Sequence, residues 1–214
     1  MFRKPIRKIG PSNRSITGKR PSIKTNTHHQ FESSLERDYL TLLEFDSDVA
    51  YYTVQPVQIN YHHENKIRRY TPDVAVYYKD AFKRKPLLIE IKYEAELIEK
   101  KNLLEPKFNA AKVFASGNGY EFKTVCEKDI RTDKLYNIKF LSRYRGSEIE
   151  AATVAIIMER FDNGDRLTPQ QLLLADDIDI NGRILHTLWQ LLANYTLNCD
   201  MNQKICMNTI LWKQ

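Results

Sequence analysis

Three charged residues, Asp73, Glu90 and Lys92, interrupt two apolar, strand-like runs between positions 70 and 92. Burying such charges is costly unless they are paired or solvated, so they either lie at solvated strand ends or do chemistry. Residues two apart in a strand point the same way, so Glu90 and Lys92 share a face. If the two runs pair as a hairpin, Asp73 at the start of one strand lies near Glu90 at the end of the other.

Two carboxylates placed in this way form an oxygen site that suits Mg²⁺. The metal would neutralise developing charge and lower the pKa of an attacking water, and the ammonium of Lys92 would add a positive charge near the phosphate. These are the requirements for hydrolysing a phosphodiester. A purely structural interpretation stays open, because X-Pro-Asp is a common turn opening and Glu-x-Lys is a common charge pair.

Glu36 is the candidate for a third carboxylate. The residues around it, 31–49, place leucines and a tyrosine at helical spacing and predict an amphipathic helix. Glu36 lies on the flank of the apolar stripe, and from there its side chain can extend along a sheet surface toward a site. Ser33 followed by Glu36 is also a capping box, so a structural role at the helix start is the alternative.

The elements that must position these residues are those of an α/β domain with a mixed sheet. His62 and His63 fall at the end of one predicted strand, where a solvated position is favoured over a phosphate contact. Pro72 interrupts the longest run. Aromatic and β-branched residues predict strands near 50–54, 57–62 and 66–78, followed by strands at 87–93 and 120–130.

A second helix is predicted between the last two strands, over residues 95–119, with a break or kink at Pro106. Its lysines, Lys107 among them, could touch DNA phosphates. A charged, solvated face is the commoner explanation for such a run of lysines.

The positive charge of the chain is concentrated at its N-terminus. Of the 33 Lys and Arg residues, eight lie within residues 1–31, and all 27 Asp and Glu residues follow. With its Pro and Gly residues, this segment predicts a basic flexible arm over residues 1–30 that is attracted to phosphate backbones or forms a solvated tail. His28 and His29 belong to the arm and are expected to be exposed.

The chain of 214 residues contains no apolar run of the roughly 20 residues that a membrane-spanning helix needs. Its N-terminus lacks the apolar stretch of a signal peptide. Three cysteines without a CxxC pair fit reduced thiols. We therefore expect a cytoplasmic protein that does not insert into membranes.

A domain boundary is predicted near residue 145, between a domain at 31–145 and a smaller one at 146–214. The smaller domain has three helical segments and then two short strands around a turn at 200–204, the outline of a winged helix-turn-helix. Residues 147–214 contain nine acidic and five basic residues. This excess of acidic residues does not favour binding to nucleic-acid phosphates, so we expect the smaller domain to bind proteins.

The segments SLERDYLTLLEFDSDVAYYTVQPVQINY, YTPDVAVYY and LLIEIKY, with the basic lead-in GKRPSIKTNTHHQFES, resemble the TnsA endonuclease subunit of heteromeric, Tn-seven-like transposases. That family belongs to the restriction-endonuclease-like PD-(D/E)xK superfamily. The resemblance implies a restriction-endonuclease-like mixed sheet flanked by helices, followed by a small C-terminal winged-helix domain.

Carried over residue by residue, the resemblance implies a catalytic set of Glu36, Asp73, Glu90 and Lys92. It implies metal ligation by Glu36, Asp73, Glu90 and Ile91, with Mg²⁺ as the cofactor and Mn²⁺ as a substitute. Some family members have glutamine where this chain has Glu90. Gln55 matches the family's Gln-Pro position and is expected near the site without an assigned role.

The implied activity is cleavage of the 5′ ends of a transposon, on the non-transferred strand, in a bacterial nucleoid. The implied partners are transposon-end DNA, a TnsB-type integrase-like transposase and a TnsC-type ATPase regulator that contacts the C-terminal domain. CRISPR-guided targeting proteins are further candidates. Two alternatives remain: a stand-alone restriction or repair nuclease of the same fold, and a non-catalytic DNA-associated scaffold.

Overall fold

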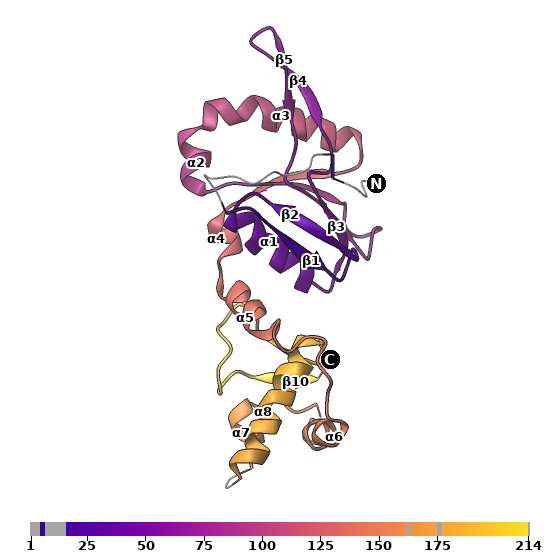
Figure 1. Cartoon of the computed structure of the whole chain (residues 1–214), viewed down its shortest axis with the longest axis vertical. Helices are drawn as coiled ribbons and strands as arrows, with labels where there is room; N and C mark the ends of the chain where they lie inside the picture. The colour runs from indigo at the N-terminus through magenta and orange to yellow at the C-terminus, as the bar shows by residue number, and fades with distance from the viewer. Residues whose placement is uncertain (1–4, 7–15, 162–163, 175–176, 214) are drawn as a thin grey trace. The chain divides into compact units, whose positions relative to one another are not determined.

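The structure is a computed structural model, and it describes residues 5–6, 16–161, 164–174 and 177–213. The chain divides into two compact units, Met1–Ile130 and Arg131–Gln214, which are described separately (Figure 1). The division falls at residue 130 rather than near residue 145. Helix α5 (Asp133–Leu141) packs against α8 (Ile178–Ala193), and this contact places α5 in the second unit.

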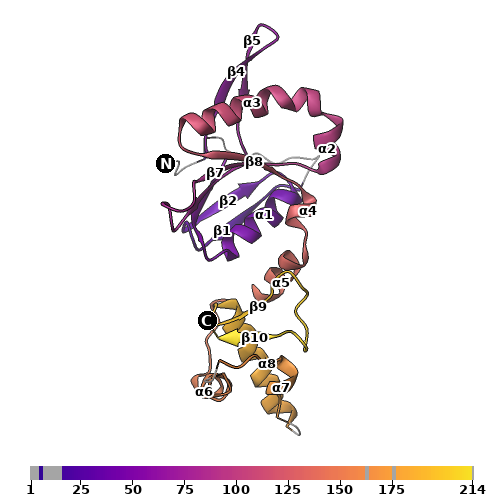
Figure 2. The same cartoon turned by 180° about the vertical axis from the view of Figure 1, so that it is seen from behind.

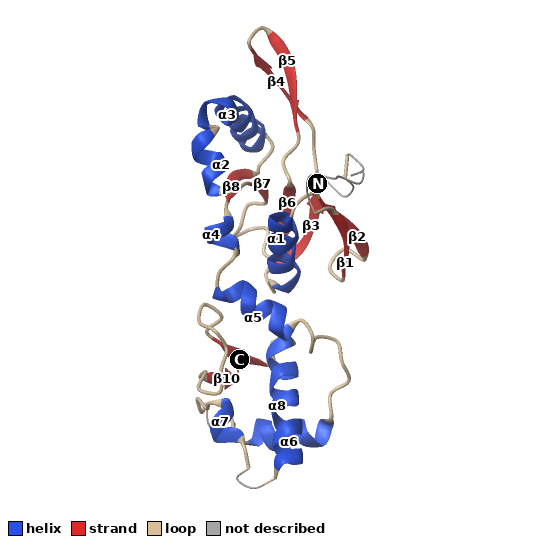
Figure 3. Ribbon diagram, turned by 60° about the vertical axis from the view of Figure 1, so that its left-hand side comes forward, coloured by secondary structure: helices blue, strands red, loops and turns tan. Residues whose placement is uncertain are grey.

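A four-stranded mixed sheet forms the centre of the first unit, in the order β3-β6-β7-β8. Strands β3, β6 and β7 run antiparallel and β8 lies parallel to β7, as the predicted mixed sheet requires. Helices α1 and α3 lie on opposite sides of it (Figures 1 and 3). The bounds are β3 Val49–Val54, β6 Val74–Tyr78, β7 Leu87–Ile91, β8 Glu121–Val125, α1 Ser34–Phe45 and α3 Lys101–Gly117.

The core of the first unit follows from strand alternation. Ala75, Tyr77 and Leu88 form one buried cluster with Ala115 of α3, so alternate residues of β6 and β7 face that helix. The same alternation directs Asp73 and Glu90 to the α3 side of the sheet. The sheet thus places its charged residues on the face that α3 covers.

The second predicted helix is interrupted, but not at Pro106. Helix α2 (Glu94–Glu99) is followed by its C-cap residue Lys100, and α3 continues through Pro106 without a break. The predicted break at Pro106 is wrong: the proline removes one intrahelical hydrogen bond, but burial of Leu104 and Ala111 on either side of it keeps the helix continuous. The predicted strand over 120–130 is also too long, since β8 ends at Val125 and α4 (Glu127–Ile130) follows.

The predicted flexible arm is wrong for residues 18–30, because β1 (Gly18–Ser22) and β2 (Thr27–Phe31) form an antiparallel hairpin. His29 is buried, contrary to expectation, whereas His28 is exposed. Buried acceptors on α1 hold the hairpin in place, as described below. Residues 1–4 and 7–15 of the predicted arm lie outside the described residues.

A second hairpin, β4 (Ile59–His63) with β5 (Lys66–Tyr70), forms a two-stranded sheet of its own. Figures 1 and 2 show it projecting beyond α3 within the first unit. The predicted interruption at Pro72 is confirmed, because β5 ends at Tyr70 and β6 begins at Val74.

The second unit is built around α8, against which α5, α6 (Ala151–Glu159), α7 (Pro169–Leu172) and β9 (Leu197–Cys199) pack. Strand β10 (Leu211–Lys213) pairs with β9 and also forms a bridge from Leu211 to Leu167. Thr168 and Gln171 form a capping box at the start of α7. No helix among the described residues is long and apolar enough to cross a membrane.

Candidate active site

Strands β6 and β7 bring the two strand carboxylates to one place. Val74 pairs with Ile89 in this antiparallel ladder, so the next position along sets Asp73 opposite Glu90. Residues opposite each other in a ladder point to the same face. The backbone N–H of Asp73 donates to the carbonyl of Ile89 over 2.9 Å, which fixes this end of the ladder. The predicted hairpin arrangement is therefore present.

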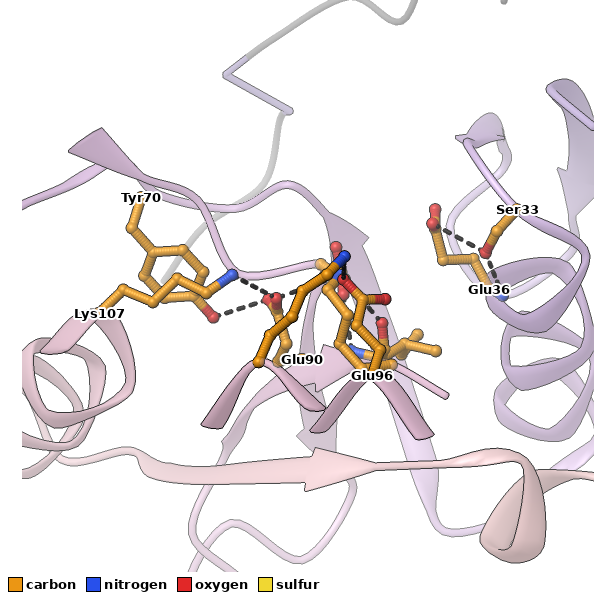
Figure 4. A network of polar contacts seen from close by, with 10 residues as sticks. Ser33, Glu36, Tyr70, Glu90, Glu96 and Lys107 are labelled. Carbon is orange, nitrogen blue, oxygen red and sulfur yellow. Dashed lines mark hydrogen bonds and ion pairs between the residues drawn. The ribbon is translucent and has the colours of Figure 1, made fainter. Parts of the chain in front are cut away.

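Glu90 is buried and strongly hydrogen-bonded. Its side chain is only 2% exposed, its Oε2 accepts from the Tyr70 hydroxyl over 2.7 Å, and its Oε1 accepts from Nζ of Lys107 over 3.0 Å. Nζ of Lys92 lies 3.3 Å from the same Oε1. Figure 4 shows Tyr70 and Lys107 converging on Glu90 from one side. The protein thus compensates this buried negative charge with two ammonium groups and a hydroxyl.

Asp73 has a different environment. Its Oδ2 accepts from the backbone N–H of Ile91 over 2.6 Å. Burial and then the negative charge of Glu90 raise the pKa of Asp73 well above its ordinary value, Lys92 opposes this, and Glu36 adds to it. Crowded like charges therefore disfavour the ionised form of Asp73, whereas a cation placed beside it would favour that form.

Lys92 completes the strand part of the site. Its Nζ donates to the carbonyl oxygen of Ile91 over 3.2 Å and pairs with Glu90. Burial alone would lower the pKa of Lys92, but the charges of Asp73 and Glu90 outweigh that effect and raise it. The lysine is therefore a positive charge in the site at neutral pH.

Glu36 lies to one side of this cluster, at the start of α1 (Figure 4). Ser33 Oγ accepts from the backbone N–H of Glu36 over 3.1 Å and donates to its Oε1 over 3.0 Å, while Oε2 accepts from the backbone N–H of Glu32. The capping interpretation is therefore confirmed, with Glu32 rather than Ser33 as the backbone donor. Burial raises the pKa of Glu36, and the charge of Lys92 lowers it, so Glu36 still interacts electrostatically with the site.

Gln55 supports the loop that carries Asp73. Its backbone N–H donates to the carbonyl of Asp73 over 2.8 Å, and its φ of 47° is in the left-handed region that costs a non-glycine residue energy. The side chain is buried, and its Oε1 has no hydrogen-bond partner among the described residues. The expected position of Gln55 near the site is confirmed, and its role is to hold the backbone at Asp73.

The donor set suits a hard divalent cation, since it offers the carboxylates of Asp73 and Glu90 and the carbonyl of Ile91. Burial and then the negative charge of Glu90 raise the pKa of Asp73, and a bound cation would oppose both effects by favouring the ionised carboxylate. Oε1 of Glu90 is already bound by two lysines, and no three His, Cys, Asp or Glu side chains of the described ranges are arranged to hold a metal as they stand. A bound cation would therefore compete with Lys92 for this oxygen.

Sequence reasoning missed the contributions of Tyr70 and Lys107. The signal for Lys107 is the stripe of Leu104, Ala111 and Ala115, the buried residues of α3, because position 107 falls on the same side at i+3 and i−4. A lysine on an apolar stripe calls for a buried acid, and Glu90 is that acid. Tyr70 has no comparable signal, since an aromatic residue at a strand end is ordinary.

The comparison with protein families matches residues 46–127 to the model described as TnsA-like endonuclease N terminal. The matched range begins just before β3, ends at the start of α4, and contains Gln55, Asp73, Glu90 and Lys92. Glu36 lies outside it. No curated protein matches the chain. The family match confirms the resemblance drawn from the sequence for this part of the chain.

Proposed function

We propose, starting from residues 46–127 as a TnsA-like endonuclease N-terminal domain, that the chain is a metal-dependent DNA endonuclease subunit of a heteromeric transposase. The observation that carries the proposal is the convergence of Asp73, Glu90 and Lys92 at one end of β6 and β7. Two carboxylates can hold a metal ion that activates a water, and a neighbouring lysine adds positive charge beside the phosphate.

In this proposal Asp73, Glu90 and the carbonyl of Ile91 hold Mg²⁺ or Mn²⁺, and Glu36 approaches from α1. The bound ion supplies a water of lowered pKa and neutralises charge on the phosphate. Lys92 orients that water and places its own positive charge beside the phosphate. Tyr70 and Lys107 are positioning residues, because they hold the Glu90 carboxylate in one orientation through contacts of 2.7 and 3.0 Å.

The proposed substrate is the 5′ end of a transposon, cut on the non-transferred strand. A TnsB-type transposase would cut and join the other strand. We assign contact with a TnsC-type ATPase to residues 147–214 of the second unit, where nine acidic residues against five basic ones favour a protein partner over DNA. CRISPR-guided proteins would act through these partners. The order helix, bridge at Leu167, two helices and two strands supports a winged-helix fold for this unit.

The test is cleavage of end-bearing DNA by the full chain with its partner subunits and Mg²⁺. We expect Asp73→Ala to abolish 5′-end cutting together with metal binding, and Lys92→Ala to slow cutting by about 10²-fold or more while metal still binds. Lys107→Met should retain part of the activity, whereas Lys112→Met, an exposed position of the same helix, should change nothing.

Equal cutting by wild type, Asp73→Ala and Lys92→Ala would reject the site. Efficient cutting by the chain alone would instead favour a stand-alone nuclease. Loss of cutting in the variants is interpretable only if they remain folded, so each variant should show a cooperative thermal transition.

A further inference from the structure

The β4–β5 hairpin is a free-standing ribbon that projects from the first unit (Figures 1 and 2). Its five-residue strands span about 17 Å at the rise of an extended chain. Glu64 and Asn65 form its turn with φ values of 50° and 57°, the left-handed pair of a tight hairpin turn. An isolated two-stranded hairpin is marginally stable in water, so the ribbon needs an anchor.

The base of the ribbon supplies that anchor. Ile59 and Tyr70 are paired across the ladder and pack with Ala111 of α3 in a buried cluster. Tyr61 of β4 packs against the edge of this cluster and is partly buried. The outer residues of the ribbon on β5, from Lys66 to Arg69, are all exposed.

Cross-strand pairing defines the face of the ribbon that packs on nothing. Asn60 pairs with Arg69, and His62 pairs with Ile67, so these four side chains point to the same side. All four are exposed, and Ile67 is 67% exposed. This face presents hydrogen-bonding groups, a positive charge and one aliphatic side chain to solvent.

The ribbon is also basic. Residues 59–70 contain Lys66, Arg68 and Arg69 against a single acid, Glu64. Glu64 is paired with Arg68 and His63, which leaves Lys66 and Arg69 without an ion-pair partner among the described residues. Unpaired cations on a projecting strand are what a polyanion would neutralise.

The ribbon leads directly into the candidate active site. Tyr70, its last residue, donates its hydroxyl to Glu90, and Asp73 follows three residues later. A duplex held against the ribbon would therefore be aligned relative to the carboxylates. The major groove, about 12 Å wide, admits a two-stranded ribbon.

We propose that the β4–β5 hairpin is a DNA-binding ribbon that holds the duplex beside the scissile phosphate, with Lys66 and Arg69 contacting phosphates. This inference rests on the proposed function, since it takes DNA as the substrate. It assigns substrate positioning to a segment that carries no catalytic group.

The test measures binding of the full chain to a short fluorescent DNA duplex across a range of salt concentrations, with chelator present so that no cleavage occurs. We expect Lys66→Ala with Arg69→Ala to weaken binding at least tenfold at about 50 mM salt, and to lower the slope of log affinity against log salt by about 2. The matched control is Lys79→Ala with Lys85→Ala, two exposed lysines beyond the opposite end of β6.

Three outcomes would overturn the DNA-binding role of the ribbon. They are an equal loss of DNA affinity in both double variants, an unchanged salt slope in the ribbon variant, and no DNA binding by the wild-type chain. The outcome is separable from that of the nuclease proposal. If Asp73→Ala abolishes cutting while the ribbon variant binds and cuts DNA as wild type does, the nuclease proposal is supported and the DNA-binding role of the ribbon is rejected. If the ribbon variant loses affinity for DNA while wild type cuts no DNA with its partners, the DNA-binding role of the ribbon is supported and the nuclease proposal is rejected.

Discussion

Two carboxylate clusters of the first unit are built in opposite ways. Glu44 of α1 is buried and accepts hydrogen bonds from the hydroxyls of Ser22 and Tyr52 and from the backbone N–H groups of Ile23 and Lys24. Burial would raise the pKa of Glu44, but these bonds outweigh it and lower the pKa. Asp73, by contrast, has its pKa raised by burial and by Glu90.

The difference separates a structural acid, Glu44, from Asp73, to which we assign a catalytic role in the proposed function. The donors around Glu44 come from the β1–β2 hairpin and β3, so the carboxylate fastens these elements to α1. The acids around Asp73 repel one another, and their arrangement costs stability in the absence of a cation. The hydrogen-bond donors around Glu44 stabilise its carboxylate and the fold, whereas the raised pKa of Asp73, buried beside another acid, fits the catalytic role proposed above.

The largest expected effect is on the Glu44 cluster. Glu44→Gln should lower the free energy of unfolding by about 3 kcal/mol, because the amide group replaces an acceptor oxygen with a donor that faces other donors. Urea unfolding measures this loss. Glu105→Gln, an exposed position on α3, is the control and should change stability by less than about 0.5 kcal/mol. A loss below about 1 kcal/mol at Glu44 would contradict the fastening role.

The sequence was sufficient for the strand part of the site because alternation and pairing are local rules. Counting residues predicts that Glu90 and Lys92 share a face and that Asp73 lies near Glu90 if the two runs pair. The β6–β7 register confirms the pairing, and the 3.3 Å contact of Lys92 with Glu90 agrees with the shared face. The hairpin at residues 18–31 could not be predicted in the same way. Its basic composition resembles a disordered tail, and the contacts that order it come from Glu44, about 20 positions away.

The same distinction explains the second helix and the domain division. Pro106 signals a break by a local rule, but packing of Leu104 and Ala111 on either side of it keeps α3 continuous. The division after Ile130 depends on contacts between α5 and α8, which are distant in sequence. Long-range packing therefore decides the features that local patterns leave open.

At the acids around Asp73 we expect a smaller change in the free energy of unfolding, and of opposite sign to that at Glu44. Asp73→Asn should raise the free energy of unfolding by about 1 kcal/mol, because it removes one of the crowded charges and keeps an oxygen that can accept from Ile91. The same variant should lose DNA cutting. Thermal unfolding in chelator checks the first part. A destabilised Asp73→Asn chain would show that the carboxylate is structural, like Glu44.

The smallest effect is the pH dependence of the β1–β2 hairpin. The ring of buried His29 packs against Tyr52 in a tilted arrangement, with ring centroids 4.6 Å apart, and its Nε2 lies 2.7 Å from Thr25 Oγ1. Burial lowers the pKa of His29 below 6.5, although Glu44 opposes this. A lowered folded-state pKa means that the unfolded chain binds protons more readily. The stability from neutral His29 is therefore present above pH 6.5 and is lost as pH falls through the folded-state pKa.

Acidification from about pH 7 to about pH 5 should accordingly reduce hydrogen-exchange protection of the hairpin amides by up to about tenfold, with β6 less affected. His29→Phe keeps an aromatic ring against Tyr52 but cannot titrate, so its hairpin protection should be nearly independent of pH in this window. Glu44 adds a second loss at lower pH, as the pH falls from about 4.5, where the unfolded chain takes up this proton, through the lowered folded-state pKa of Glu44. If wild type and His29→Phe lose hairpin protection equally between pH 7 and pH 5, the titrating group lies elsewhere, and the contrast between the two clusters rests on Glu44 alone.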